Sequence, residues 1–366
     1  MKKLYIFLLL ILTFKFVIAQ TWTGNTSTNW AIATNWSPNG VPAGASNVTI
    51  PASVVSGNWP AFSGNVTINS INMVAGSQLN VNGFTLTING INTYNYFTGA
   101  ILNNTNGATD IVLNIYTGTS GYATYFRSNT VNDNIIFNLT GTSTGYFYEG
   151  DVAPANQFNG NATYNINDVL PVYISNSSAS QYAGNLTINR TVAGSTSMFG
   201  GGAAITGNFL FTNNAGGANS IGSIANKTNI AGTINITALY PSSSTFSLYR
   251  IINQTTGGII NVQNSTGLDL RKDTLKVASL SVTGYKSGAY GYFLNNAVTG
   301  NVTLSDDASN SGGWETYLRS NTITGNASFT NNGSNAFYDA DGAADANTYN
   351  GNVTYNGGGS GALYIA

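Results

Sequence analysis

The 366-residue sequence contains no cysteine and no histidine, and only 7% of its residues are charged. These absences exclude disulfide scaffolds, metal sites built on imidazole or thiolate, and Ser-His-Asp or Cys-His catalysis. Three of the twelve basic residues lie within the first twenty positions, which leaves nine basic against thirteen acidic residues in the remainder. Nucleic-acid binding needs clustered lysine and arginine, so this balance excludes it. The chain is instead 42% hydrophobic and 12% aromatic, enough to bury a large core.

Residues 1–19 have the pattern of a secretory signal peptide. Two lysines precede an apolar run that ends in Val17-Ile18-Ala19. A membrane anchor is the alternative, but the run is shorter than a bilayer requires and Lys15 interrupts it. We therefore expect cleavage after Ala19, export of the chain, and no membrane span after the signal is removed.

A glycine-asparagine motif followed by an alternating strand recurs along the rest of the chain. Copies begin at Gly64, Gly160, Gly184, Gly207, Gly300, Gly325 and Gly351. Weaker copies fill the intervals, so that the mean spacing is about 24 residues, and an aromatic-rich strand precedes most copies. Such a unit cannot bury its own apolar face, whereas stacked copies can. The repeat therefore predicts an all-β fold, a parallel β-helix (β-solenoid) with coils of about 24 residues, because a β-propeller blade would need about 40. We expect a right-handed helix from the general preference of parallel connections.

The ends of a β-solenoid need caps, because their unpaired strands invite aggregation. Four of the five tryptophans lie before the regular repeat, at Trp22, Trp30, Trp36 and Trp59. They predict an N-terminal cap over residues 20–60, followed by β-helix repeats over residues 61–366. The chain stops within an aromatic strand, so we expect that it is truncated at its C-terminus and that its open coil end can self-associate.

Strand alternation predicts a polar outer face. In each glycine-asparagine strand one set of side chains is apolar, and the opposite set is threonine, serine or asparagine. The residues of this column that are candidates for surface binding are Thr67, Thr163, Thr187, Thr303 and Thr354. Stacked Thr and Asn side chains that stabilise the rod are one interpretation. Binding of a repetitive ligand, such as a glycan or ice, is the other, although we expect Ile136 and Leu210 to interrupt the column, which argues against ice.

A longer repeat is superimposed on the short one. The segment TYFRSNTV from Thr124 returns as TYLRSNTI from Thr316, eight coils later. The duplication places Arg127 and Arg319 on equivalent coils that are too far apart to share one active site. We expect each guanidinium to bond locally, to a turn carbonyl or to an acidic loop.

Acidic residues offer two weak signals for chemistry. Asp339, Asp341 and Asp345 begin like a calcium loop but lack its third spaced ligand and closing glutamate, so a weak calcium site and a solvated acidic turn are both compatible. We expect no other cofactor. Polysaccharide lyases and glycosidases often use β-helices, yet they need paired carboxylates or an acidic cluster beside a base. Glu149 with Asp151 has no such partner one coil away, so we expect no catalytic residues.

The segment from Thr21 to Pro51 combines W-x-G at Trp22, N-W at Asn35-Trp36, V-P at Val41-Pro42 and a final N-V-T-I-P. With the stretch up to Gly90, it resembles the N-terminal region of large cell-surface repeat proteins exported by Bacteroidetes-type bacteria. The resemblance covers about residues 20–90 and implies an adhesin-like protein at the bacterial cell surface. It brings no catalytic residues.

These observations together predict a non-catalytic, secreted or cell-surface β-solenoid that serves as an adhesin or a structural stalk. A glycan-binding module is the alternative, and a β-helix lyase or glycosidase is less favoured. The expected partner is a glycan or another cell-surface ligand.

Overall fold

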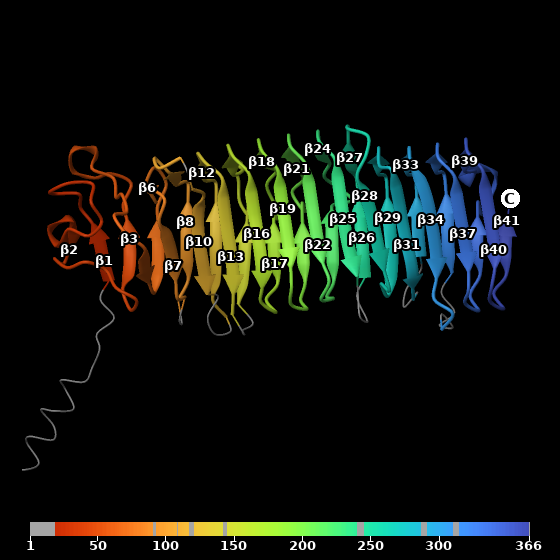
Figure 1. Ribbon diagram of the computed structural model, residues 1–366, viewed down its shortest axis with the longest axis horizontal. Helices are drawn as coiled ribbons and strands as arrows, with labels where there is room; N and C mark the ends of the chain where they lie inside the picture. The colour runs from red at the N-terminus through yellow and green to blue at the C-terminus, as the bar shows by residue number, and fades with distance from the viewer. Residues whose placement is uncertain are drawn as a thin grey trace, which may run out of the picture.

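The computed structural model describes residues 19–90, 93–107, 109–116, 121–141, 145–239, 245–286, 291–309 and 315–365. The predicted signal peptide, apart from Ala19, lies outside these residues. The described chain forms a rod in which each coil stacks on the one before it (Figure 1). It makes about 13 parallel turns of about 24 residues, so the predicted β-solenoid is confirmed. No helix among the described residues is long and apolar enough to cross a membrane.

Three sheets run along the rod, and from β4 onwards successive strands join them in rotation. Within the described chain, sheet 1 has sixteen strands, in the order β2 (Trp36–Ser37), β1 (Ala19–Trp22), β3 (Asn47–Ile50), β5 (Ser70–Met73), β8 (Asn95–Thr98), β11 (Ala123–Arg127), β14 (Tyr146–Glu149), β17 (Val172–Ile174), β20 (Thr196–Met198), β23 (Asn219–Gly222), β26 (Thr245–Tyr249), β29 (Gly267–Arg271), β32 (Gly291–Leu294), β35 (Thr316–Arg319), β38 (Phe337–Asp339) and β41 (Leu363–Ile365). Sheet 2 has thirteen described strands, β4 (Val66–Ile68), β7 (Thr85–Ile88), β10 (Ile111–Tyr116), β13 (Ile135–Thr140), β16 (Ala162–Asn167), β19 (Leu186–Arg190), β22 (Phe209–Asn213), β25 (Ile234–Leu239), β28 (Ile259–Gln263), β31 (Ser279–Tyr285), β34 (Asn301–Asp306), β37 (Ala327–Asn331) and β40 (Val353–Gly357). Sheet 3 has twelve described strands, β6 (Gln78–Asn80), β9 (Ile101–Asn103), β12 (Thr130–Val131), β15 (Gln157–Phe158), β18 (Ser180–Tyr182), β21 (Ala203–Ile205), β24 (Thr228–Ile230), β27 (Ile251–Asn253), β30 (Thr274–Leu275), β33 (Ala297–Val298), β36 (Thr322–Ile323) and β39 (Thr348–Tyr349). Three short 3-10 helices lie in connections: η1 (Ala33–Asn35), η2 (Val55–Gly57) and η3 (Ala343–Asp345).

The core is one continuous apolar column between the sheets, which extends from the first tryptophans to Phe337. Every second side chain of a sheet 2 strand points into it and meets the equivalent side chain of the next coil. Leu113, Phe137, Tyr164 and Ile188, for example, are in register on four successive coils and fully buried. Each coil therefore covers the apolar face of its neighbour, which a single coil cannot do alone.

The glycine-asparagine motif forms a corner between sheets 3 and 2. The Asn161 Oδ1 accepts a hydrogen bond from the backbone N–H of Asn185 at 2.8 Å, and the Asn185 Oδ1 accepts one from that of Asn208 at 2.8 Å. Glycine precedes these asparagines because the coils approach closely. A Cβ at Gly184 would lie 2.7 Å from the backbone nitrogen of Asn161, closer than real contacts allow.

Substitution of Gly184 by alanine should therefore lower the free energy of unfolding by about 1–3 kcal/mol, because the added methyl group forces two coils apart. Gly64 is the matched control, since nothing lies within 4 Å of a Cβ built on it. We expect Gly64→Ala to leave stability unchanged or slightly increased. Denaturant unfolding of the two variants checks the prediction, and equal effects at the two sites would contradict it.

The N-terminal end of the core is covered by clustered tryptophans, as predicted. Trp22 and Trp30 each pack edge-on against Trp36, with ring centroids 4.9 and 4.5 Å apart. The Trp22 indole also donates a hydrogen bond to the Asn58 carbonyl at 2.8 Å. The fourth tryptophan, Trp59, is only half-buried and lies outside this cluster of rings.

The corner between sheets 1 and 3 contains a second, buried ladder of side-chain amides. We name it the inner asparagine ladder, and its members are Asn129, Asn156, Asn296, Asn321 and Asn347. Asn296 shows the pattern: its Nδ2 donates to the Leu270 carbonyl of the preceding coil at 3.1 Å, and its Oδ1 accepts from the Asp273 backbone N–H at 3.0 Å. In both coils the preceding residue has a left-handed backbone. Asn295, with φ 58°, precedes Asn296, and Lys272, with φ 61°, precedes Asp273. The ladder thus satisfies backbone groups that the turn leaves unpaired inside the rod.

Candidate functional site

The outer face of sheet 1 carries a row of tyrosines that follows the long axis of the rod. We name it the tyrosine row, and it consists of Tyr96, Tyr125, Tyr148 and Tyr173 in one half and Tyr292, Tyr317, Tyr338 and Tyr364 in the other. Within each half every tyrosine is in register with the next. The rings stack nearly parallel, with centroids 5.3 Å apart between Tyr125 and Tyr148 and 4.8 Å apart between Tyr148 and Tyr173. Their outer edges and hydroxyl groups therefore form a regular strip on the surface.

Paired charges flank the tyrosine row. The Arg127 guanidinium lies 3.8 Å from the centre of the Tyr125 ring and makes two hydrogen bonds to Asp151, at 2.7 and 2.6 Å. The hydrogen bonds to Asp151 raise the pKa of Arg127 above its ordinary value, so this cation stays charged. In the duplicated block Arg319 lies over Tyr317 and bonds Asp341 at 2.6 Å. The predicted local role of both arginines is confirmed, and each guanidinium's charge is balanced by an aspartate.

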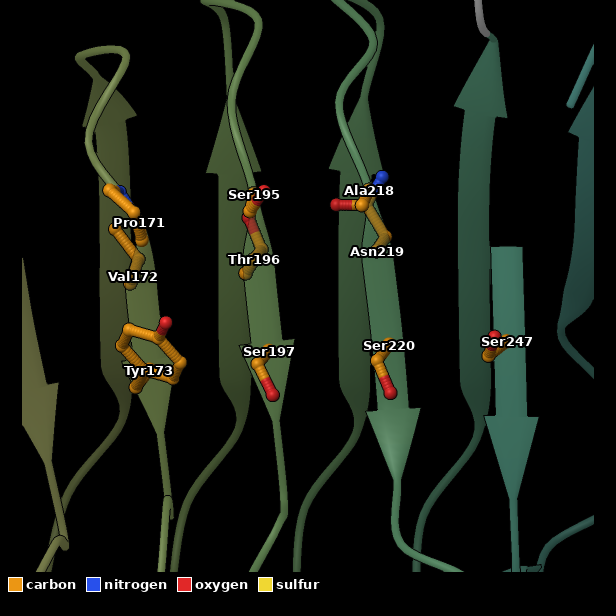
Figure 2. Close-up of a pocket in the computed structure, with 10 residues that line it drawn as sticks. All are labelled: Pro171, Val172, Tyr173, Ser195, Thr196, Ser197, Ala218, Asn219, Ser220 and Ser247. Atoms are coloured by element: carbon orange, nitrogen blue, oxygen red, sulfur yellow. The ribbon is translucent and has the colours of Figure 1, made fainter. Parts of the chain in front are cut away.

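The two halves of the tyrosine row are separated by a shallow trough with a volume of about 190 Å³ (Figure 2). Between Tyr173 and Tyr292 the register places Ser197, Ser220, Ser247 and Asp269, and the three serines line the trough. Tyr173 forms one end of the trough, with one ring face stacked on Tyr148 and the other towards the serines. Within the described chain, the hydroxyl groups of Ser197 and Ser220 have no hydrogen-bond partner.

The outer face of sheet 2 carries the predicted polar column, but its membership differs. The observed row, which we name the polar row, is Thr67, Thr87, Asn114, Asn138, Asn165, Asn189, Thr212, Thr237, Asn261, Ser281, Thr303, Ser328 and Thr354. Thr67, Thr303 and Thr354 are correctly placed. The placement of Thr163 and Thr187 is wrong: they lie in the adjacent row.

The error has a simple geometric cause. The strands at the two ends of sheet 2 begin two residues later in the register than those in the middle, so that Val302 aligns with Ile188 rather than with Leu186. A shift of two residues keeps the inward and outward alternation, so the sequence pattern does not reveal it. Ile136 and Leu210 belong to the adjacent row too, and within the described strands no apolar residue interrupts the polar row.

In part of the polar row, neighbouring side chains are hydrogen-bonded to one another. The Asn138 Nδ2 donates to the Asn114 Oδ1 at 2.8 Å, the Asn165 Nδ2 to the Asn138 Oδ1 at 2.9 Å, and the Asn189 Nδ2 to the Asn165 Oδ1 at 3.1 Å. These bonds run along the axis and join four coils. They favour the structural interpretation of this face, because the amides are occupied in holding coils together.

The predicted calcium ligands do not converge. Asp339 is buried and accepts hydrogen bonds from Asn347, Tyr349 and Tyr355, whereas Asp341 and Asp345 face Arg319 outside the core. Asp339 is the inward-pointing last residue of β38, whereas Asp341 lies in the following turn and Asp345 in η3, both at the surface. Among the described residues no group of three acidic side chains could hold a metal ion, so the structure does not bring the three candidate calcium ligands together.

Glu149 is the counterpart of Asp339 in the first block and is completely buried. Its carboxylate accepts hydrogen bonds from Asn156, from the Ser175 backbone N–H and the Ser180 hydroxyl at 2.6 Å, and from Tyr182 at 2.9 Å. Burial raises the pKa of Glu149, and these donors partly oppose the shift. Glu149 and Asp151 therefore do not act as a pair, because Asp151 bonds to Arg127 on the surface.

Comparison with protein-family models, with curated proteins and with solved structures finds no match to the chain. The surface rows themselves are therefore the basis for a functional proposal.

Proposed function

We propose that the protein is a non-catalytic rod, secreted or held at a cell surface, that acts as an adhesin or stalk through the outer face of sheet 1. The tyrosine row carries this proposal. Tyrosine and arginine are enriched among the residues that dominate binding energy at protein interfaces, and the rigid tyrosine ring loses little conformational entropy on contact. The row repeats with every coil in each half, so a rod of this kind offers many equivalent contacts to one partner.

The proposal predicts that a double substitution, Tyr125→Ser with Tyr148→Ser, weakens adhesion. Beads coated with the full chain are measured for retention under flow on bacterial cells and on polysaccharide-coated glass. We expect at least a five-fold loss of retention, because one half of the tyrosine row is interrupted. Tyr116→Ser is the control, since Tyr116 is an exposed tyrosine that belongs to sheet 2.

Unfolding of the double variant is measured in parallel, because stacked rings also stabilise the rod. Retention that is unchanged, or reduced equally by Tyr116→Ser, would overturn the adhesive role of this face. New reducing ends released from the polysaccharide would overturn the non-catalytic proposal.

A further inference from the structure

A notch of about 360 Å³ lies where the N-terminal cap meets the first strands of sheet 3. Its volume is within the range of about 300–1,000 Å³ that is typical of small-molecule sites. Ala61 lines it and extends the sheet through parallel bridges to Asn29 and Asn80. The next strands carry the larger side chains of Asn103 and Asn132 at equivalent outward positions, so the short side chain of Ala61 creates the hollow.

One wall of the notch is aromatic. The bridge between Ala61 and Asn80 places Trp59 opposite Gln78 on the neighbouring strand, and both side chains are half-buried. Within the described chain, neither the Trp59 indole N–H nor the Gln78 amide has a hydrogen-bond partner. The three tryptophans of the cap cluster are buried, so Trp59 is the one among these four that offers its ring to a ligand.

The opposite wall consists of amides held in fixed orientations. The Asn132 Nδ2 donates to the Asn103 Oδ1 at 2.8 Å, and the Asn80 Nδ2 donates to the Thr105 Oγ1 at 2.8 Å. The Asn103 Nδ2 therefore remains available as a donor. The Asn104 Oδ1 also has no hydrogen-bond partner, but it is buried and therefore closed to a ligand.

Among the described residues, no charged side chain lines the notch. A phosphate or nucleic acid would require cations, and a divalent cation would require carboxylates. An aromatic ring beside fixed neutral donors and acceptors instead fits a ligand with an apolar C–H face and many hydroxyl groups. We propose that the notch binds a neutral glycan, with one sugar ring packed on Trp59 and its hydroxyl groups bonded by Gln78 and Asn103.

This site goes beyond the adhesive role of the tyrosine row and does not depend on it, because the two lie on different sheets. Loss of binding at one of them leaves the other measurable by its own variants.

The test uses the variant Ala61→Leu, whose larger side chain fills the notch without removing any hydrogen bond. Full-length protein is titrated with cellohexaose, mannohexaose and hexameric N-acetylglucosamine, and with hexagalacturonate as the anionic probe, and binding is followed by tryptophan fluorescence and calorimetry. We expect saturable binding of at least one neutral glycan and at least a ten-fold loss of affinity in Ala61→Leu. Ala183→Leu is the matched control, because Ala183 is an outward alanine farther along the same sheet.

A second pair of variants separates recognition from folding. Gln78→Ala should weaken binding at least three-fold, whereas Gln157→Ala, in the same row three coils later, should not. Absence of binding to every neutral probe, stronger binding of hexagalacturonate, or equal effects of Ala61→Leu and Ala183→Leu would overturn the proposal.

Discussion

Replacement of Arg190 by methionine is expected to lower the free energy of unfolding by at least about 3 kcal/mol. Arg190 is completely enclosed at the end of β19. Its guanidinium donates to five oxygen atoms between 2.9 and 3.1 Å, in the preceding coil and in its own turn, namely the carbonyls of Asp168, Leu170, Val192 and Ser195 and the Thr196 hydroxyl. Burial lowers the pKa of Arg190 to about 10, so the group is still charged at neutral pH. Methionine fills the space but leaves these acceptors without a donor.

The control for this experiment is Arg250→Met. Arg250 also donates to two carbonyls of the preceding coil, those of Ile224 and Ala225, but it does so at the surface, where water can replace it. We expect a loss below about 1 kcal/mol. Denaturant unfolding followed by circular dichroism compares the two variants, and a similar loss in both would show that burial of the guanidinium is not what matters.

The architecture could be predicted from the sequence because its signals repeat. The glycine represented by Gly184 recurs in coil after coil, as does the alternation of polar and apolar side chains. Each copy therefore predicts the same stacking. Handedness and register are different, because they depend on the lengths of turns between strands. Thr163 and Thr187, which lie outside the polar row, show this. A shift of two residues moves a side chain to the adjacent row but leaves its outward direction unchanged.

The tyrosine row could have been predicted in part from the sequence. The aromatic strands at Val172 and Thr316 were evident, and tyrosine takes the outward position in both. What the pattern does not show is that the intervening coils replace tyrosine by three serines and Asp269, because a polar residue at an outward position looks like any other surface residue. The trough beside Tyr173 exists only once the coils are in register.

Buried charged residues are the clearest departure from the pattern. Glu149, Arg190 and Asp339 occupy inward positions where alternation calls for apolar side chains. The period of two indicates their direction, but only the structure shows how each is satisfied, because the partners come from turns and from neighbouring coils. Residue type alone would place all three at the surface, because charged side chains are rarely buried unless they are paired.

Asp273 is a further buried ionisable residue, and it occupies a position of the inner asparagine ladder. Its Oδ1 accepts a hydrogen bond from the Ile251 backbone N–H at 2.8 Å, as a ladder asparagine would. Its Oδ2 is buried without a partner. An asparagine Nδ2 at that position would reach the Leu248 carbonyl, because Leu248 is in register with Leu270, the acceptor of Asn296. Burial, reinforced by the nearby Asp269, raises the pKa of Asp273 well above its usual range.

Asp273→Asn is therefore expected to raise the free energy of unfolding at neutral pH by about 1–3 kcal/mol, because it supplies the missing donor. An acid whose pKa is raised on folding stabilises the fold while protonated, and this contribution is lost as the pH rises through the folded-state pKa. The advantage of the variant should thus be largest at neutral pH and shrink towards pH 4. Hydrogen bonds from Ser309 lower the pKa of Asp307, so Asp307→Asn should give no gain. Thermal unfolding between pH 4 and 8 measures both variants, and a gain for Asp273→Asn that is the same at every pH would show that Asp273 does not titrate inside the rod.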